Sequence, residues 1–218
     1  WAYSVDLNGR TFDAGFTFSG WFYVKKFRSD QERIVGYGPD SFLIDMEPNG
    51  PLRIWFKEAQ GIFSGVELDQ WVNLAMTAGH GQVKFYKNGE LAYEESMTDT
   101  SVTFPQNEWN DFGLGGFWGY VKQLKIWYTA LSQQALKAEI AVADSNVNVP
   151  THQWLMDEGV GSAMQDTGSP GGTTINYENV KIWKNINSPY EILLESELHI
   201  YGEVMPGEEF HARFASEN

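Results

Sequence analysis

The sequence predicts an all-β protein: a two-sheet antiparallel sandwich with one short helix and a C-terminal strand hairpin. Apolar and polar residues alternate with a period of two along many short segments, as they do in half-buried strands. Aromatic residues make up 15% of the chain, and 22 glycines punctuate these segments, which is typical of sandwiches with tight turns. Residues 132–140 are the one clear helix candidate.

The first third of the chain contains several short apolar segments separated by turn residues. Strands are expected at residues 1–7, 16–24, 33–38, 41–46 and 51–56. The segment 16–24 is the densest in β-forming side chains. Asn8-Gly9 predicts a turn after the first strand, and residues 47–50 predict a hairpin loop.

The central part of the chain predicts two consecutive hairpins. Val72, Leu74 and Met76 alternate with polar or small residues, and Gly79-His80-Gly81 follows as a turn. The next strand covers residues 83–86. It ends at Asn88-Gly89, a pair that tolerates the positive φ of a type I′ turn, and a third strand follows.

Glycine is frequent from Phe112 to Tyr120, where bulky residues alternate with small ones. A phosphate-binding loop is one interpretation, but no helix or Lys-Ser/Thr pair follows it. Close approach of strands explains the glycines better. Residues 121–128 predict a strand, and Ser132 is a plausible N-cap for the helix that follows.

The chain divides after the helix. Residues 1–142 form the predicted sandwich, residues 143–150 a polar linker, residues 151–186 a further segment, and residues 187–218 an acidic amphipathic tail. The tail has seven acidic residues and one arginine. Five of its apolar residues share one parity, which favours strands: Ile192, Leu194, Leu198, Ile200 and Val204. Ser188-Pro189 also fits a helix start.

Composition excludes several classes of function. The formal net charge is −14, and there is no cysteine. Nucleic-acid binding needs a basic patch, which is not visible, so we expect no nucleic-acid partner. No apolar run approaches the roughly 20 residues of a membrane span. Because residue 1 is Trp1 and not methionine, we expect a processed or excised piece of a longer product.

Several motifs together resemble the laminin-G-like, concanavalin A-like lectin family. They are Phe16-Thr17-Phe18-Ser19-Gly20-Trp21, Trp71-Val72-Asn73-Leu74-Ala75, Tyr86-Lys87-Asn88-Gly89, and Phe117-Trp118-Gly119-Tyr120-Val121 followed by Ala130-Leu131-Ser132. The resemblance covers roughly the first 140 residues and implies a jelly-roll sandwich. The family's usual Asp pair after the Phe-x-Gly element is replaced here by Lys122-Gln123.

The opening motif of this family is missing at the start of the chain. A similar motif occurs instead at residues 154–161, followed by Asp166-Thr167-Gly168. Residues 151–186 therefore resemble the family's N-terminal strand and loop. Either the domain is permuted and this segment completes the sandwich, which we favour, or the segment begins a second domain. A half-sandwich would leave open edges exposed.

Carbohydrate binding is the function that the resemblance and the aromatic residues favour. Sugar rings stack on exposed aromatic side chains, while neighbouring polar groups bind the hydroxyls. Our candidates are aromatics in glycine-rich or turn settings and their polar neighbours: Trp109, Asn110, Asp111, Trp118, Phe117 and Tyr37.

A structural calcium ion is also expected. Asp157, Glu158 and Asp166 lie among glycines, so carboxylate and carbonyl oxygens could converge on one loop. The alternative is that these acids only stabilise turns, since Asp bonds readily to nearby backbone groups.

Catalysis is less favoured, although glucanases and lyases share the sandwich. The glucanase pattern Glu-x-Asp-x-x-Glu begins at Glu67 and Asp69 but has Val72 in its third position. Glu195, Glu197 and His199 share one parity, yet a solvated strand face explains them.

We therefore expect a non-catalytic, lectin-like module at an extracellular, cell-surface or virion location. It would bind a glycan or glycosylated surface and could oligomerise through the tail strand. The alternatives are a structural domain of a surface adhesin or phage-type virion protein and, less favoured, a polysaccharide lyase or glycoside hydrolase.

Overall fold

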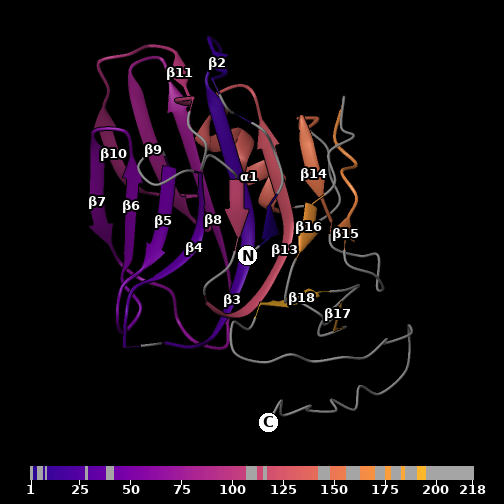
Figure 1. Cartoon of the computed structure of the whole chain (residues 1–218). Coiled ribbons are helices and arrows are strands. Elements are labelled where there is room, and N and C mark those ends of the chain that lie inside the picture. Colours follow the sequence, from indigo (N-terminus) through magenta and orange to yellow (C-terminus); the bar gives the residue numbers. More distant parts are fainter. Residues whose placement is uncertain are drawn as a thin grey trace.

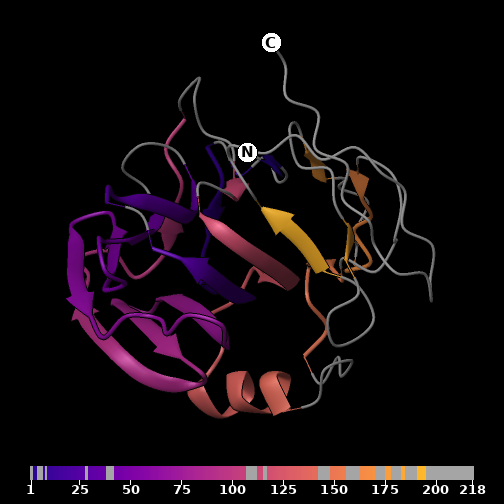
Figure 2. The same ribbon diagram turned by 90° about the horizontal axis from the view of Figure 1, so that it is seen from below.

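A computed structural model of the 218-residue chain describes residues 2–3, 7, 9–27, 29–37, 42–106, 112–114, 117–141, 148–155, 163–169, 175–177, 183–184 and 191–194. In this part of the chain, two antiparallel sheets enclose a common core, and one helix packs on the outside (Figures 1 and 2). The predicted all-β sandwich with one short helix is confirmed.

The first sheet joins strands from both ends of the chain. In spatial order, its described strands are β15 (Ala163–Met164), β16 (Ile175–Tyr177), β1 (Ala2–Tyr3), β12 (Phe112–Leu114), β4 (Glu32–Tyr37), β5 (Phe42–Met46), β6 (Leu52–Phe56) and β7 (Ala59–Phe63). Strands β4 to β7 are consecutive hairpins. Strand β1 pairs with β12 on one side and with β16 on the other.

The second sheet carries the longest strands. In spatial order, its described strands are β10 (Glu90–Ser96), β9 (Gln82–Lys87), β8 (Trp71–Gly79), β3 (Phe16–Lys26), β13 (Trp118–Trp127), β18 (Glu191–Leu194) and β17 (Trp183–Lys184). Strand β14 (His152–Trp154) also pairs with β13, while β2 (Thr11–Phe12) and β11 (Val102–Thr103) pair separately.

The tail confirms part of the strand prediction. Strand β18 pairs antiparallel with β13 and with β17, so residues 191–194 form a strand and not a helix. The remainder of the predicted tail, residues 187–190 and 195–218, lies outside the described residues.

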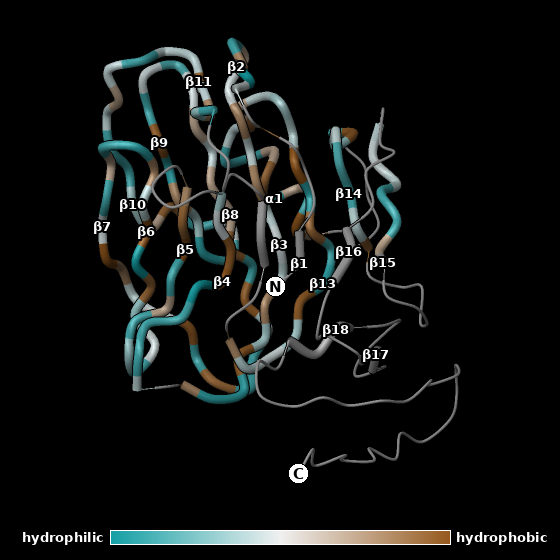
Figure 3. Tube along the Cα trace, in the orientation of Figure 1, coloured by the Kyte–Doolittle hydropathy of each residue, from teal (hydrophilic) through white to brown (hydrophobic). Residues whose placement is uncertain are grey.

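Phenylalanine side chains dominate the core between the sheets. Along β3, Phe16, Phe18 and Phe22 are fully buried. The ring of Phe104 lies 5.0 Å from that of Phe16 and 4.9 Å from that of Tyr37, centroid to centroid, in edge-to-face packing. Such pairs add about 0.5–1.5 kcal/mol beyond area burial. Figure 3 shows hydrophobic and hydrophilic residues interleaved along strands such as β9 and β13, as a two-faced strand requires.

Two local signals in the sequence produce the predicted local structure. Asn88 and Gly89 have φ angles of 52° and 77°, so the β9–β10 turn has the predicted geometry. The Ser132 hydroxyl oxygen accepts a hydrogen bond from the Ala135 backbone N–H at 3.1 Å and caps helix α1 (Gln133–Ala141). No helix in the described part of the chain is long and apolar enough to cross a membrane.

Gly119 confirms that the glycine-rich segment serves strand packing. A Cβ atom at this position would overlap the backbone carbonyl of Tyr23 on the paired strand. Phe112–Leu114 likewise forms a strand, β12, so these residues do not cradle phosphate.

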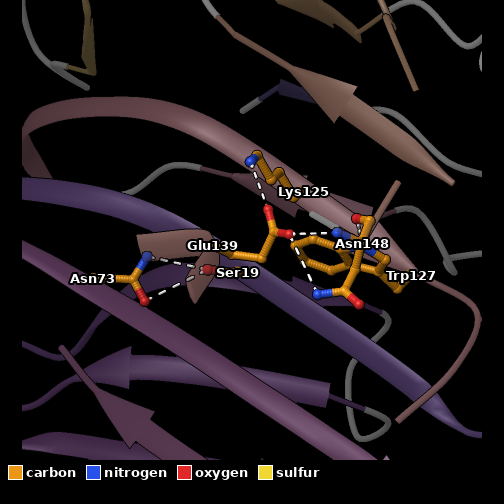
Figure 4. A network of polar contacts seen from close by, with 6 residues as sticks. All are labelled: Ser19, Asn73, Lys125, Trp127, Glu139 and Asn148. Atoms are coloured by element: carbon orange, nitrogen blue, oxygen red, sulfur yellow. Dashed lines mark hydrogen bonds and ion pairs between the residues drawn. The ribbon is translucent and has the colours of Figure 1, made fainter. Parts of the chain in front are cut away.

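A buried polar network holds α1 against the second sheet (Figure 4). The Lys125 ammonium on β13 lies 3.1 Å from Glu139 Oε2 on the helix. The other carboxylate oxygen of Glu139 accepts a hydrogen bond from the Asn148 N–H at 2.7 Å. The Trp127 indole donates to the Asn148 carbonyl at 2.7 Å. The network thus joins a strand, the helix and the segment that follows the helix.

The segment after residue 150 contributes to the sandwich core. Strand β14 pairs with β13 through Leu124–Trp154 and Ile126–His152, and the Trp154 side chain is fully buried in the main core cluster. The domain boundaries themselves stay a prediction.

Candidate functional site

Five aromatic side chains lie on the outer surface of the second sheet, on the side opposite the core. Along β3, Trp21 and Tyr23 are half-buried and alternate with the fully buried Phe22. Strand β8 adds the half-buried Trp71, and β13 adds the half-buried Trp118 and Tyr120, which is only 4% exposed. We call Trp21, Tyr23, Trp71, Trp118 and Tyr120 the aromatic face.

Strand register places three of these rings side by side. Tyr23 is directly opposite Trp71 on β8 and opposite Tyr120 on β13. The Tyr23 ring centroid lies 5.4 Å from that of Trp71 and 5.5 Å from that of Tyr120. Directly opposed side chains in antiparallel strands are always neighbours. Strand pairing alone therefore holds these three rings next to one another.

Three lysines cover the aromatic face. The Nζ atom of Lys122 lies 4.0 Å from the Trp71 ring centroid, and that of Lys26 lies 4.5 Å from the Trp118 ring centroid. Lys25 lies over Tyr120 at 5.6 Å. Cations at these distances are attracted by the ring quadrupole. The face is therefore cationic, in a chain whose net charge is −14.

The groups that a ligand can reach on this face are mainly ring faces and ammonium groups. The indole N–H groups of Trp71 and Trp118 are shielded from solvent and form no hydrogen bond within the described residues. At the rim, the Tyr23 hydroxyl donates a hydrogen bond to the carboxylate of the exposed Asp69 at 3.4 Å. Asp69 has a φ of 58°, which a short polar side chain tolerates better than a branched one.

The structure divides the predicted ligand-binding residues into three groups. Trp118 lies on the aromatic face. Phe117 and Tyr37 are fully buried in the core, so a sugar ring cannot stack on them without opening the sandwich, and their assignment to a ligand surface is corrected. Three further candidates lie outside the described residues: Trp109, Asn110 and Asp111.

Sequence reasoning missed most of the aromatic face, although a signal was present. In residues 16–24, bulky aromatics occupy both parities of one strand: Phe18 and Phe22 on one, Trp21 and Tyr23 on the other. A strand with one solvated face normally alternates apolar with polar residues. Aromatics on both faces therefore mark a strand whose outer surface also carries apolar side chains.

Asp166, a predicted calcium ligand, holds its own loop together. Its Oδ1 atom accepts hydrogen bonds from the backbone N–H groups of Gln153 and Gly168, each at 2.9 Å. Its Oδ2 atom lies 2.6 Å from His152 Nδ1. Both oxygens already have N–H partners, so this residue fits the turn-forming alternative better than a metal ligand. Asp157 and Glu158 lie outside the described residues, and the calcium site stays a prediction.

His152 extends this contact into the sandwich. Its Nε2 atom lies 2.8 Å from the Tyr128 hydroxyl, and its ring stacks on Trp154 at 5.7 Å between centroids. The Tyr128 ring lies 4.3 Å from that of Phe12. The Tyr128–His152–Asp166 chain therefore joins the residue after β13, strand β14 and the loop after β15.

No catalytic arrangement is found in the part of the chain that the structure describes. Glu67 and Asp69 are exposed, and Val72, which replaces the third acid of the glucanase pattern, is buried. Among the described residues, no three His, Asp or Glu side chains cluster as metal ligands. Glu195, Glu197 and His199 lie outside the described residues.

Comparison with solved structures shows the same fold in other proteins. A candidate carbohydrate-binding protein from Bacteroides ovatus superposes with a TM-score of 0.66 at 17% identity, over 80% of this chain and 55% of that chain. The heptameric SAP-like pentraxin of Limulus polyphemus gives a TM-score of 0.51 at 13% identity, over 80% of this chain and 88% of that chain. A sialidase from Trypanosoma rangeli gives a TM-score of 0.48 at 14% identity, over 61% of this chain and 23% of that one, which is too low to show a shared fold.

The chain thus spans about half of the Bacteroides protein and about a quarter of the sialidase. At these identities the likeness concerns the fold alone. No curated protein matches the chain in sequence. A family profile does match: that of the concanavalin A-like lectin/glucanases superfamily, over residues 3–137. This match spans more than half of the chain and includes the strands that carry the aromatic face, and the chain therefore belongs to the concanavalin A-like lectin/glucanases superfamily.

Proposed function

We propose that this chain is a non-catalytic carbohydrate-binding module whose aromatic face stacks on a glycan or a glycosylated surface. The observation that carries the proposal is the set of partly exposed rings of Tyr23, Trp71 and Trp118 on the outside of the second sheet. Tyr120, which is 4% exposed, packs beside Tyr23 and supports them from below. The C–H faces of sugar rings pack against aromatic rings, and aromatic side chains bury more area than most others.

The lysines over the rings supply the hydrogen-bond donors. A cation–π contact at an exposed site contributes only about 0.5–1 kcal/mol, so a sugar ring can displace the exposed Lys26 from Trp118 at small cost. The displaced ammonium group can then donate up to three hydrogen bonds to ligand hydroxyls or carboxylates. Three ammonium groups together favour a glycan that carries acidic groups.

We also propose that the chain binds a structural calcium ion and works at an extracellular, cell-surface or virion location. The alternative is a structural domain of an adhesin or phage-type virion protein that assembles through its tail strand without a glycan. That alternative predicts a stable oligomer that binds no glycan. A clean monomer in light scattering on the full chain would therefore exclude it, whereas the binding module can be a monomer or an oligomer.

Affinity electrophoresis in gels that contain one polysaccharide each tests the proposal. The panel combines acidic polymers, alginate and pectin, with neutral ones, xylan and mixed-linkage β-glucan. We expect at least one polymer to retard the chain, and Trp71→Ala with Trp118→Ala to weaken binding by about tenfold or more, equivalent to about 1.4 kcal/mol. Failure of every polymer to retard the chain would contradict the proposal.

A matched control separates stacking from general surface change. Ile62 on β7 is 66% exposed and lies on the other sheet, so Ile62→Ala should leave binding unchanged. Trp118→Phe keeps an aromatic ring and should retain more affinity than Trp118→Ala. Equal losses for the two Trp118 variants would argue against stacking at this residue.

A further inference from the structure

A hollow of about 300 Å³ lies on the outer surface of the second sheet, next to the start of helix α1. Thr77 and Tyr86 project into it from β8 and β9. Gln82 and Leu91 line one side, and Leu131 and Gln133 line the side next to the helix. Pockets for small ligands begin at about this size.

Two hydroxyl groups on buried residues in this hollow have no partner within the described protein. Thr77 is 4% exposed and Tyr86 is 3% exposed. Neither side chain forms a hydrogen bond or ion pair with any other described residue, although both line the open space. Neither hydroxyl oxygen is among the shielded polar atoms of the described residues, so both remain accessible from the hollow. The hollow therefore presents hydroxyls that a bound polar group would satisfy.

The chemistry of the lining points to a neutral ligand that is rich in hydroxyl groups. The cation at this site, Lys84, is already paired with Glu94 at 3.3 Å. The hydroxyls of Thr77 and Tyr86 and the carboxamide of Gln82 each both donate and accept hydrogen bonds. Leu91, which is 44% exposed, adds an apolar side to the hollow. We propose that this hollow binds a single neutral sugar ring.

This site is separate from the aromatic face. Thr77 and Trp71 are on the same side of β8, six residues apart, which is about 20 Å along a strand. Between them, Ala75 packs against Leu136 of α1. One site can therefore fail without the other, and the two proposals are tested independently.

The test is an amide-shift titration of the full chain with the methyl glycosides of glucose, galactose and mannose. We expect at least one of them to shift the amide signals of residues 77–86 and 130–133 saturably, with a dissociation constant of about 1 mM. The variant Thr77→Val with Tyr86→Phe preserves shape and removes both hydroxyls. It should weaken binding about tenfold or more. Trp71→Ala should leave these shifts unchanged.

The melting temperature of the double variant provides a second readout. Because neither hydroxyl is bonded within the described protein, the variant should melt at the same temperature as the wild type or higher. A lower melting temperature would overturn the proposal, since it would mean that the hydroxyls stabilise the fold. Absence of shifts with all three glycosides, or shifts that persist undiminished in the double variant, would also overturn it.

Discussion

Replacing Lys125 with a methionine should loosen α1 from the second sheet, because the Glu139 carboxylate would stay buried without its counter-ion. The two side chains are 5% and 3% exposed, and their charged atoms lie 3.1 Å apart. Removing one partner of a pair this deeply buried costs about 3–5 kcal/mol. For a chain of this size, each kcal/mol corresponds to about 2–4 °C, so the melting temperature should fall by roughly 6–20 °C.

Glu139→Gln is the complementary change. It removes the charge but keeps an oxygen that can accept the Asn148 N–H. It should cost a similar amount, because the buried Lys125 ammonium then loses the negative charge that neutralises it. The double variant, which combines Lys125→Met with Glu139→Gln, contains no buried charge at this site. It should therefore be more stable than the sum of the single losses predicts, by roughly 2–3 kcal/mol.

Urea unfolding followed by tryptophan fluorescence measures all four proteins, with unchanged m-values as the check that the same unit unfolds. The reasoning would be refuted if either single variant lowered the free energy of unfolding by less than about 1 kcal/mol. It would also be refuted if the loss in the double variant equalled the sum of the two single losses. Either result would mean that solvent or neighbouring groups satisfy the two charges.

Three other predictions test the turns, an alkaline transition and the calcium site. Asn88→Ala should lower the free energy of unfolding in urea by about 2 kcal/mol, because alanine is strained at a φ of 52° and the Asn73 backbone N–H loses its acceptor. Asn49 has a φ of 68° and no side-chain hydrogen bond in the described structure, so Asn49→Ala should lower it by about half as much. Burial raises the pKa of Tyr93 to about 12, and a hydrogen bond to Glu95 and its charge add to the shift. The folded state therefore holds this proton more tightly than the unfolded chain, whose tyrosine pKa is about 10. Stability should hold below about pH 10 and fall as the pH rises towards 12, and Tyr93→Phe should remove that part of the decline in thermal melts. If calcium binds, chelation should lower the melting temperature of the wild type. Asp166→Asn should lower the melting temperature with or without chelator, because Asp166 bonds to its own loop. A wild-type melting curve that chelation leaves unchanged would contradict the calcium proposal.

Local signals in the sequence determined the strands, the turns and the helix start. Asn88-Gly89 specifies its turn because few other residue pairs accept two successive positive φ angles. Ser132 specifies the helix start because its hydroxyl oxygen satisfies a backbone N–H that the helix itself leaves unpaired. These interactions are made within a few residues, so the sequence alone reveals them.

Tertiary structure alone decided which aromatic residues face outward. Phe117 and Trp118 are adjacent, and sequence reasoning selected both as ligand candidates. Alternation along a strand requires that they point to opposite faces, but it does not say which face is covered. The second sheet stacks on the first through Phe117, which leaves Trp118 on the outer surface.

The grouping of distant residues also depended on the tertiary fold. Tyr23, Trp71 and Tyr120 are far apart in sequence, and their contact follows from the register of three strands. The hydroxyls of Thr77 and Tyr86 share a hollow for the same reason. A sequence specifies the period of each strand, whereas pairing and stacking are cooperative properties of the whole chain, because each strand buries its apolar side only against the others.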